Sequence, residues 1–312
     1  VQLRAVNAAG PSAASVAVAL TPTLSNNPGA DWTAQTSSAD NNWTSVTYGN
    51  GLFVAVASIN IRIDNAVMTS PDGITWTAQI SSGNNLFTSV TYGNGLFVAV
   101  GNLSLMTSPD GITWTSRTEP TNSDWRSVTY GNGLFVAVAH NGGVMTSPDA
   151  VTWTSRTSPY SVTWKSVTYG NGLFVAVSSS PGLVNSVMTS PDGITWTART
   201  STTDDGWESV TYGNSLFVAV AYDNVMTSPD GITWTAQTSA TNNYWNDVTY
   251  GNGMFVAVSS TGTGNRAMTS PDGMIWTSRA SAVDNYWNSV TYGNGQFVAV
   301  SSTGTGNRVM SS

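Results

Sequence analysis

Two groups of side chains suited to carbohydrate binding lie 42 residues apart in the C-terminal part of the chain. The two groups are Tyr244, Trp245, Asn246 and Arg266, and Tyr286, Trp287, Asn288 and Arg308. An aromatic pair offers flat apolar faces, while amide and guanidinium groups donate hydrogen bonds to hydroxyls. The spacing therefore predicts two equivalent weak sites with a Kd near ~1 mM each, tightened by bivalent binding. The alternative is a recent duplication that has not diverged, because the segments Asn242–Met268 and Asp284–Met310 differ little.

Acid–base chemistry has only one candidate pair near the centre of the expected fold. A glycosidase needs two carboxylates about 5 to 10 Å apart, and Glu208 with Asp247 is the pair that the pattern offers. The competing interpretation pairs Glu208 with Lys165 of the neighbouring repeat, and we favour it. We therefore expect no catalytic residues.

Metal and cofactor chemistry is also not expected. The chain has no cysteine and a single histidine, His140, in a glycine-rich loop where a surface role is predicted. The sequence Asp204–Gly206 resembles the start of a calcium loop but lacks the ligands that should follow. We predict no metal and no cofactor.

Composition limits the class of partner. A net charge of -7 and a pI near 4.4 argue against nucleic acid, which requires clustered Lys and Arg. No apolar run approaches the length of a membrane span, so membrane insertion is not expected. Few charged residues with many Thr and Asn favour an extracellular or cell-surface protein, and the remaining partners are a glycan or a protein surface.

The elements that would position these residues are set by a repeat. The phrase VTYGNGLFVAV, or a close variant, starts at Val46, Val90, Val128, Val167, Val210, Val248 and Val290. The mean spacing of about 41 residues suits a four-stranded propeller blade. Each repeat predicts a strand ending in SVTY, a tight Asn-Gly hairpin, the buried strand LFVAV, a third strand VMTS and a fourth such as ITWTAQ. The fold class is therefore all-β, a seven-bladed β-propeller of four-stranded blades.

A turn of the type SPDG joins the third and fourth strands. The segment TSPDGITW resembles the Asp-box of the sialidase-type (BNR-repeat) propellers, with one residue fewer between Asp and Trp. The resemblance covers Asp31 to Ser312 and implies a structural box on the face opposite the family's active site. A sialidase site would need three converging arginines, but the candidates end fourth strands, roughly 14 Å outside the first strands. These are Arg117, Arg156, Arg199 and Arg279.

The ends of the chain predict how the ring closes. The last repeat stops after a third strand, and the segment Asp31–Thr36 has the sequence of a fourth strand. We expect residues 31–36 to pair with Val309–Ser312 and remove the open sheet edge. Residues 1–24 resemble the end of a fibronectin type III domain, or form an unrelated hairpin, so the predicted units are 1–24 and a propeller at 25–312. We expect a monomeric propeller within a larger modular chain.

The repeat also separates two faces of the ring. YGNG and SPDG turns lie on a constant face, whereas loops such as Ser58–Ala66 and Ser178–Ser186 lie on a variable face. The variable face holds most cations and the four tyrosines outside the repeated phrase, which favours recognition. The aromatics that open the first strands should instead pack between blades: Trp43, Phe87, Trp125, Trp164, Trp207, Trp245 and Trp287. We predict a non-catalytic binding module; the alternatives are a structural spacer in an adhesin-like protein or a degenerate sialidase-like glycoside hydrolase.

Overall fold

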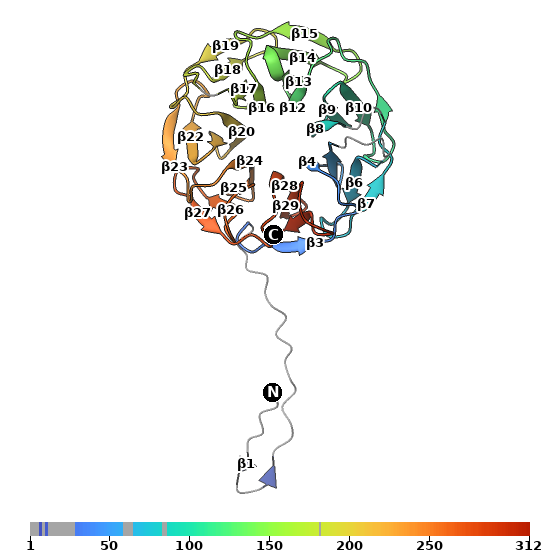
Figure 1. The fold of residues 1–312 in the computed structure, drawn as a ribbon, viewed down its shortest axis with the longest axis vertical. Helices are drawn as coiled ribbons and strands as arrows, with labels where there is room; N and C mark the ends of the chain where they lie inside the picture. Colours follow the sequence, from blue (N-terminus) through green and yellow to red (C-terminus); the bar gives the residue numbers. More distant parts are fainter. Residues whose placement is uncertain (1–5, 8–9, 12–28, 59–64, 83–85, 181) are drawn as a thin grey trace.

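The computed structural model describes residues 6–7, 10–11, 29–58, 65–82, 86–180 and 182–312. Seven four-stranded antiparallel sheets stand around a central axis like the blades of a propeller (Figure 1). The predicted fold class is confirmed. Among the described residues the one helical element is a short 3-10 turn, η1 (His140–Gly142), between the second and third strands of blade 3.

Each blade follows the chain from the axis outward. Blade 1 contains β4 (Trp43–Gly49), β5 (Leu52–Ala57), β6 (Val67–Ser70) and β7 (Thr77–Gln79). Blade 2 contains β8 (Phe87–Gly93), β9 (Leu96–Gly101), β10 (Ser104–Ser108) and β11 (Thr115–Ser116). Blade 3 contains β12 (Trp125–Gly131), β13 (Leu134–Ala139), β14 (Gly143–Ser147) and β15 (Thr154–Thr157). Blade 4 contains β16 (Trp164–Gly170), β17 (Leu173–Ser178), β18 (Val187–Ser190) and β19 (Thr197–Arg199).

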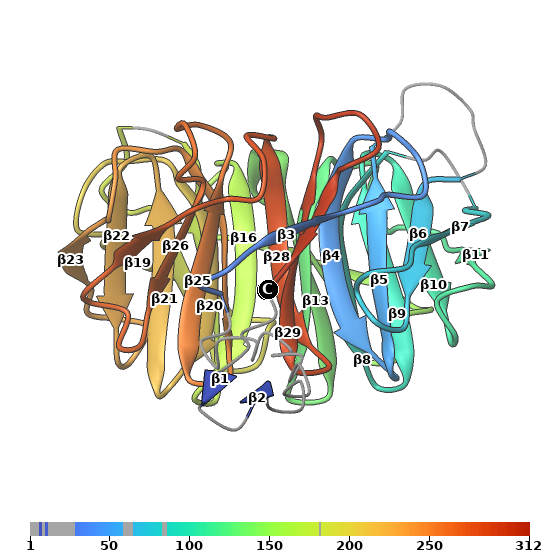
Figure 2. The same ribbon diagram turned by 90° about the horizontal axis from the view of Figure 1, so that it is seen from below.

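The remaining blades repeat this order. Blade 5 contains β20 (Trp207–Gly213), β21 (Leu216–Ala221), β22 (Asn224–Ser228) and β23 (Thr235–Thr238). Blade 6 contains β24 (Trp245–Gly251), β25 (Met254–Ser259), β26 (Ala267–Ser270) and β27 (Thr277–Arg279). Blade 7 contains β28 (Trp287–Gly293), β29 (Gln296–Ser301), β30 (Val309–Ser311) and β3 (Thr33–Gln35). The first three strands run roughly along the axis of the ring (Figure 2).

Blade 7 closes the ring with strands from opposite ends of the sequence. Thr33 pairs with Ser311, and Gln35 pairs with Val309, in an antiparallel register. The amide of Gly29 also donates to Ser312 Oγ at 2.6 Å. The predicted closure by residues 31–36 is confirmed. Within residues 1–24, β1 (Val6–Asn7) pairs with β2 (Gly10–Pro11), and the rest of that predicted unit lies outside the described residues.

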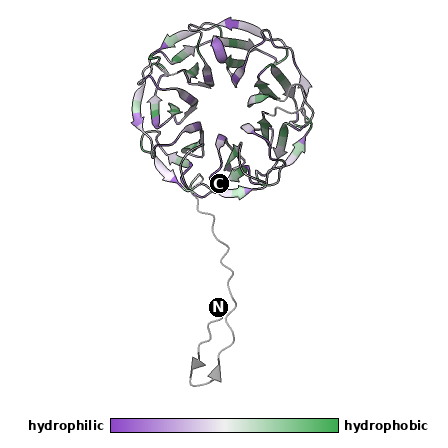
Figure 3. Cartoon of the chain, in the orientation of Figure 1, coloured by the Kyte–Doolittle hydropathy of each residue, from purple (hydrophilic) through white to green (hydrophobic). Residues whose placement is uncertain are grey.

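The cores lie between blades rather than within one. In one cluster, Val98 and Val100 of blade 2 pack on Trp125, Phe135 and Met145 of blade 3, and each of the other interfaces has a corresponding cluster. Apolar residues concentrate in the middle strands, where both faces of a blade are covered by its neighbours (Figure 3). The first-strand aromatics are fully buried in these clusters, as predicted.

The Asn-Gly turns have the backbone that a two-residue hairpin requires. Asn50 and Gly51 have φ values of 49° and 76°, both in the left-handed region typical of a type I′ turn. In the SPDG turns, one carboxylate oxygen organises the loop: Asp72 Oδ1 accepts from the amides of Ile74 and Thr75 at 2.9 and 2.8 Å. These amide hydrogen bonds lower the pKa of the Asp72 carboxyl. The constant face is therefore built by turn chemistry.

Candidate functional site on the propeller axis

Every first strand carries a β-bulge directly after its opening aromatic. In blade 1 the register shifts between Trp43 and Ser45, so Thr44 is an extra residue without a partner on β5. A bulge redirects the side chain at which it occurs, and here that side chain reaches the mouth of the axis. The seven bulge residues are Thr44, Thr88, Arg126, Lys165, Glu208, Asn246 and Asn288.

These seven residues form the wall of an axial pocket of about 400 Å³. Asn42, Ser58 and Ser302 at its mouth belong to variable loops, so the pocket opens on the variable face. Its polar lining contrasts with the apolar interfaces around it. All seven blades present a side chain to this one volume.

The residue after each bulge forms the constant floor of the pocket. Ser45 Oγ accepts from the amide of Val90 in the next blade at 3.1 Å, and Ser289 accepts from Val46 at 3.2 Å across the ring closure. Blade 6 has Asp247 at this position; its Oδ2 accepts from the amide of Val290 at 2.8 Å. The floor therefore ties each blade to the next and departs from serine only at Asp247, whereas the wall differs in chemistry from blade to blade.

Glu208 is held by two neighbours. Lys165 Nζ lies 3.0 Å from Glu208 Oε2, which confirms the pairing favoured from the sequence. Tyr244 Oη donates to Glu208 Oε1 at 2.6 Å. Burial and the adjacent carboxylate raise the pKa of the Tyr244 phenol. Both oxygens of Glu208 are thus occupied.

Asp247, the other carboxylate of the possible catalytic pair, serves the floor. Its Oδ1 accepts from Ser209 Oγ at 2.7 Å and from its neighbour Val248 N at 3.0 Å. Burial raises the pKa of Asp247, although the donors around it act in the opposite direction. Every oxygen of the two carboxylates therefore has at least one partner among the described residues.

The tryptophan of each predicted aromatic pair is fully buried. Trp245 and Trp287 are both 0% exposed, and their indole nitrogens donate to the carbonyls of Thr241 and Val283. The predicted stacking of a sugar on these two indoles is therefore wrong. The aromatic residue that opens the first strand of every blade packs between blades instead. The fold requires a buried aromatic side chain at the start of each first strand.

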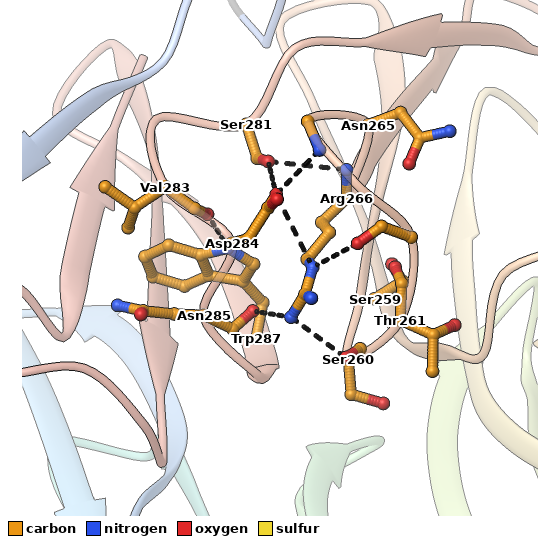
Figure 4. Close-up of polar contacts among 12 residues, drawn as sticks. Ser259, Ser260, Thr261, Asn265, Arg266, Ser281, Val283, Asp284, Asn285 and Trp287 are labelled. Carbon is orange, nitrogen blue, oxygen red and sulfur yellow. Dashed lines mark hydrogen bonds and ion pairs between the residues drawn. The ribbon is translucent and has the colours of Figure 1, made fainter.

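The two predicted arginines join loops of adjacent blades. Arg266 donates to the carbonyls of Ser260 and Gly262 in its own loop and to Asn285 in blade 7, at 2.8 to 3.0 Å (Figure 4). Asp284 Oδ1 lies 3.6 Å from Arg266 Nε, and the guanidinium also lies over the Tyr286 ring at 5.6 Å. The side chain is 12% exposed and joins two blades, and its predicted role as a donor to a ligand stays a prediction.

Arg308 repeats this arrangement across the ring closure. It donates to the carbonyls of Ser302, Gly304 and Asn41, and its Nε lies 3.6 Å from Asp40 Oδ1. We call the two arrangements the arginine clamps: Arg266 with Asp284–Asn285, and Arg308 with Asp40–Asn41. The duplicated loops therefore hold blades together.

The other predicted site residues remain near solvent or near the pocket. Asn246 and Asn288 line the axial pocket, and Tyr286 is 51% exposed. Tyr244 is half-buried and pairs with Tyr222, with ring centroids 6.1 Å apart, while Tyr222 itself is 56% exposed. Ligand binding by Tyr244 and Tyr286 stays a prediction. Thr44 and Thr88 share the bulge position of the two asparagines, although we assigned them no ligand-binding role from the sequence.

Among the described residues, neither the sialidase-type arginine site nor a metal site considered from the sequence is assembled. Arg117, Arg156, Arg199 and Arg279 each bond a threonine of their own third strand at the rim, so they do not converge. His140 is exposed and within hydrogen-bond distance of Thr163 Oγ1, as expected for a surface residue. Among the described residues no group of three or more His, Cys, Asp or Glu side chains is arranged to hold a metal ion. In the same part of the chain, no helix has the length and apolarity of a membrane span.

Comparison with solved structures shows the fold alone. The chain is similar to a streptogramin B lyase, with a TM-score of 0.78 and 11% identity over 90% of this chain and 96% of that one. It is also similar to YCF48 from Cyanidioschyzon merolae, with a TM-score of 0.68, 15% identity and coverage of 90% and 98%. A structure described as YCF48 bound to D1 peptide matches with a TM-score of 0.67, 16% identity and coverage of 93% and 98%. No protein-family model matches the chain, and no curated protein matches it.

Proposed function

We propose that the chain is a non-catalytic binding module that holds a glycan or a protein surface on the variable face of its propeller, outside the cell or at the cell surface. The observation that carries the proposal is the axial pocket. Seven blades supply one variable side chain each to a single polar volume of about 400 Å³, on a frame whose other positions hardly change. A rigid frame with variable side chains at one end suits recognition.

Three exposed tyrosines extend this surface beyond the pocket. Tyr160, Tyr222 and Tyr286 are 42%, 56% and 51% exposed, and all lie in loops of the variable face. Tyrosine offers a rigid ring and a hydroxyl at a small cost in conformational entropy, which favours contact with either a sugar or a peptide. A similar ring is bound to a peptide in one of the solved structures, which supports a binding role for this architecture without assigning a ligand.

A non-catalytic role is supported by the hydrogen bonding of the two axial carboxylates. Glu208 is occupied by Lys165 and Tyr244, and Asp247 by Ser209 and the amide of Val290. We further propose that the SPDG turns are shortened Asp-boxes with a structural role. Support comes from the Asp side chains, which accept hydrogen bonds from backbone amides of their own turns.

The proposal is tested by screening the purified chain on a glycan array and in pull-downs against cell-surface protein extracts. We expect a ligand whose retention falls at least about fivefold when Tyr160, Tyr222 and Tyr286 are all replaced by Ala, since each lost contact contributes about 1 kcal/mol. Ile112→Ser is the matched control, because Ile112 is 52% exposed on the constant face. Equal loss in the control, or retention of the ligand by the triple variant, would contradict the assignment to the variable face.

A structural spacer is the second candidate. The observation that favours it is the use of Arg266, Arg308, Trp245 and Trp287 in packing and clamping. Failure of both screens would support the spacer, and turnover of a fluorogenic glycoside would instead revive the hydrolase alternative.

A further inference from the structure

The wall of the axial pocket has one part that offers hydrogen-bond acceptors and another that offers donors. The acceptor part comes from four consecutive blades: 6, 7, 1 and 2. Asn246 Nδ2 donates to the carbonyl of Trp287 at 2.7 Å, and Asn288 Nδ2 donates to that of Trp43 at 2.8 Å. Thr44 and Thr88 hydroxyls do the same to Phe87 and Trp125 at 2.8 and 2.6 Å. Each of these side chains thus uses a donor to join its blade to the next.

What these four residues leave for a ligand is acceptor capacity. An asparagine whose amide nitrogen is engaged still has its carbonyl oxygen, and a threonine hydroxyl that donates still has lone pairs. No hydrogen bond to Asn246 Oδ1 or Asn288 Oδ1 occurs among the described residues. We call this part of the wall the acceptor arc: Asn246, Asn288, Thr44 and Thr88.

The next two blades provide donors. Arg126 is paired with Asp124, and Lys165 is paired with Glu208 at 3.0 Å. The Lys165 ammonium has three donors, of which the ion pair uses one, and the side chain is 38% exposed. Because each cation already has a carboxylate partner, this side of the pocket offers hydrogen-bond donors without excess positive charge.

We infer that the axial pocket binds the terminal uncharged pyranose of a glycan, with sugar hydroxyls donating to the acceptor arc and sugar oxygens accepting from Lys165. This inference rests on the proposed binding function and names its ligand class and its site. Several hydroxyls spread around a ring match four acceptors spread over four blades, whereas one ammonium would reach only some of them. An acidic sugar is disfavoured because both cations are paired and Asp247 adds a carboxylate at the floor.

The inference is tested by saturation-transfer NMR and calorimetry with neutral methyl pyranosides of glucose, galactose, mannose and N-acetylglucosamine. Methyl glucuronide is the charged comparator. We expect at least one neutral pyranoside to bind with a Kd on the order of 1 mM, and the glucuronide to bind at least about fivefold more weakly. Tighter binding of the glucuronide, or no neutral sugar bound at about 20 mM, would overturn the inference.

Two variants locate the site. Lys165→Thr with Glu208→Thr removes the ion pair together, so no lone charge remains, and threonine already occupies this position in blades 1 and 2. Asn246→Val removes the acceptor together with the donor to Trp287, whereas Asn246→Thr keeps both and is its paired control. The ion-pair variant and Asn246→Val should each weaken the neutral sugar at least about fivefold, the effect of losing one hydrogen bond, with cooperative unfolding retained, and Asn246→Thr should bind like the parent protein.

The matched control is Arg199→Gln, which removes a cation at the rim where other blades have glutamine, such as Gln79 and Gln237. It should leave sugar affinity unchanged. If an array ligand depends on the exposed tyrosines but is unaffected by the pocket variants, the binding function stands and the axial assignment falls. If no ligand is found in either experiment, both fall.

Discussion

The seven bulge residues occupy one backbone position, yet they include two threonines, two asparagines, an arginine, a lysine and a glutamate. Four of them satisfy the same demand, a donor to the carbonyl of the next blade. The sequence allowed us to place Glu208 and Asp247 near the centre of the ring and to pair Glu208 with Lys165. It did not reveal the bulge, because an inserted residue looks like any other in an irregular polar stretch. The burial of the first-strand aromatics was predicted for the ring as a whole. Trp245 and Trp287 were nevertheless also assigned to sugar stacking, since stacking and packing use the same residue type.

At the residue scale, Asp247→Ser restores the floor residue of the other six blades. Burial raises the pKa of Asp247 in the folded state, so the folded state favours the protonated form. The stability linked to that proton is present below the unfolded pKa, about 3.9, and is lost as pH rises through the folded value. We therefore expect the variant to be more stable at pH 7, by on the order of 1 kcal/mol.

The measurement is thermal unfolding of both proteins from pH 3 to pH 8. The gain in Tm should shrink toward acid pH, where Asp247 is protonated in the native protein. A variant that is less stable at pH 7 would mean that the three donors around the carboxylate outweigh its burial.

At the scale of elements, the turns were the most predictable part of the molecule. Asn-Gly and SPDG have backbone requirements that few other residues meet, so their conformation followed from composition. The arginine clamps were not predictable, because an arginine in a glycine-rich loop has the same sequence whether its acceptors are neighbouring carbonyls or a ligand. Their partners at Asp284 and Asp40 come from the next blade, a relation visible only once the ring is assembled.

The turn of blade 5 departs from the repeat. Ser215 has φ 60° where the other six blades have glycine. A left-handed residue with a side chain is strained, whereas glycine adopts this conformation freely at some entropic cost. Ser215→Gly should therefore stabilise the protein by about 0.5 to 1 kcal/mol, measured by chemical denaturation. The reciprocal change, Gly253→Ser in blade 6, should destabilise by a similar amount; an effect of the same sign in both variants would contradict the explanation.

Loss of a clamp should loosen one interface between blades. Arg308→Ala removes three hydrogen bonds to carbonyls of Ser302, Gly304 and Asn41 from a side chain that is 14% exposed. We expect a loss of about 2 to 3 kcal/mol, typical of hydrogen bonds to a charged group, with faster amide exchange around Asp40. Arg308→Lys should rescue little, because a lysine cannot reproduce the fork geometry. An Arg199→Gln control that is equally destabilised would show that the effect is not specific to the clamp.

At the scale of the whole molecule, the repeat spacing and the missing fourth strand were enough to predict seven blades and the way they close. The two ends of the ring meet in the β3–β30 pairing. What the repeat does not encode is the division of the axial pocket into acceptors and donors, because that division arises from the order of blades around the ring.

Deleting residues 1–36 should expose the edge of β30 and leave its backbone groups unpaired. We expect aggregation, or a large fall in Tm, monitored by light scattering and calorimetry. Deleting only residues 1–24 is the control and should have a much smaller effect. A 1–36 deletion that melts like the full chain would be incompatible with closure by this strand.

The arginine clamps have a consequence for how such a ring can grow. Each clamp joins the loop of one blade to an Asp-Asn pair just before the first strand of the following blade. The arginine and its partners are therefore encoded in neighbouring repeats. Copying a stretch of 42 residues, the spacing of the last two repeats, reproduces both halves of the joint in the correct order. A new copy of the repeat would contain the arginine that contacts the next blade, and this holds even where the next blade is blade 1. Duplication of one repeat would therefore carry both partners of the interblade contact with it.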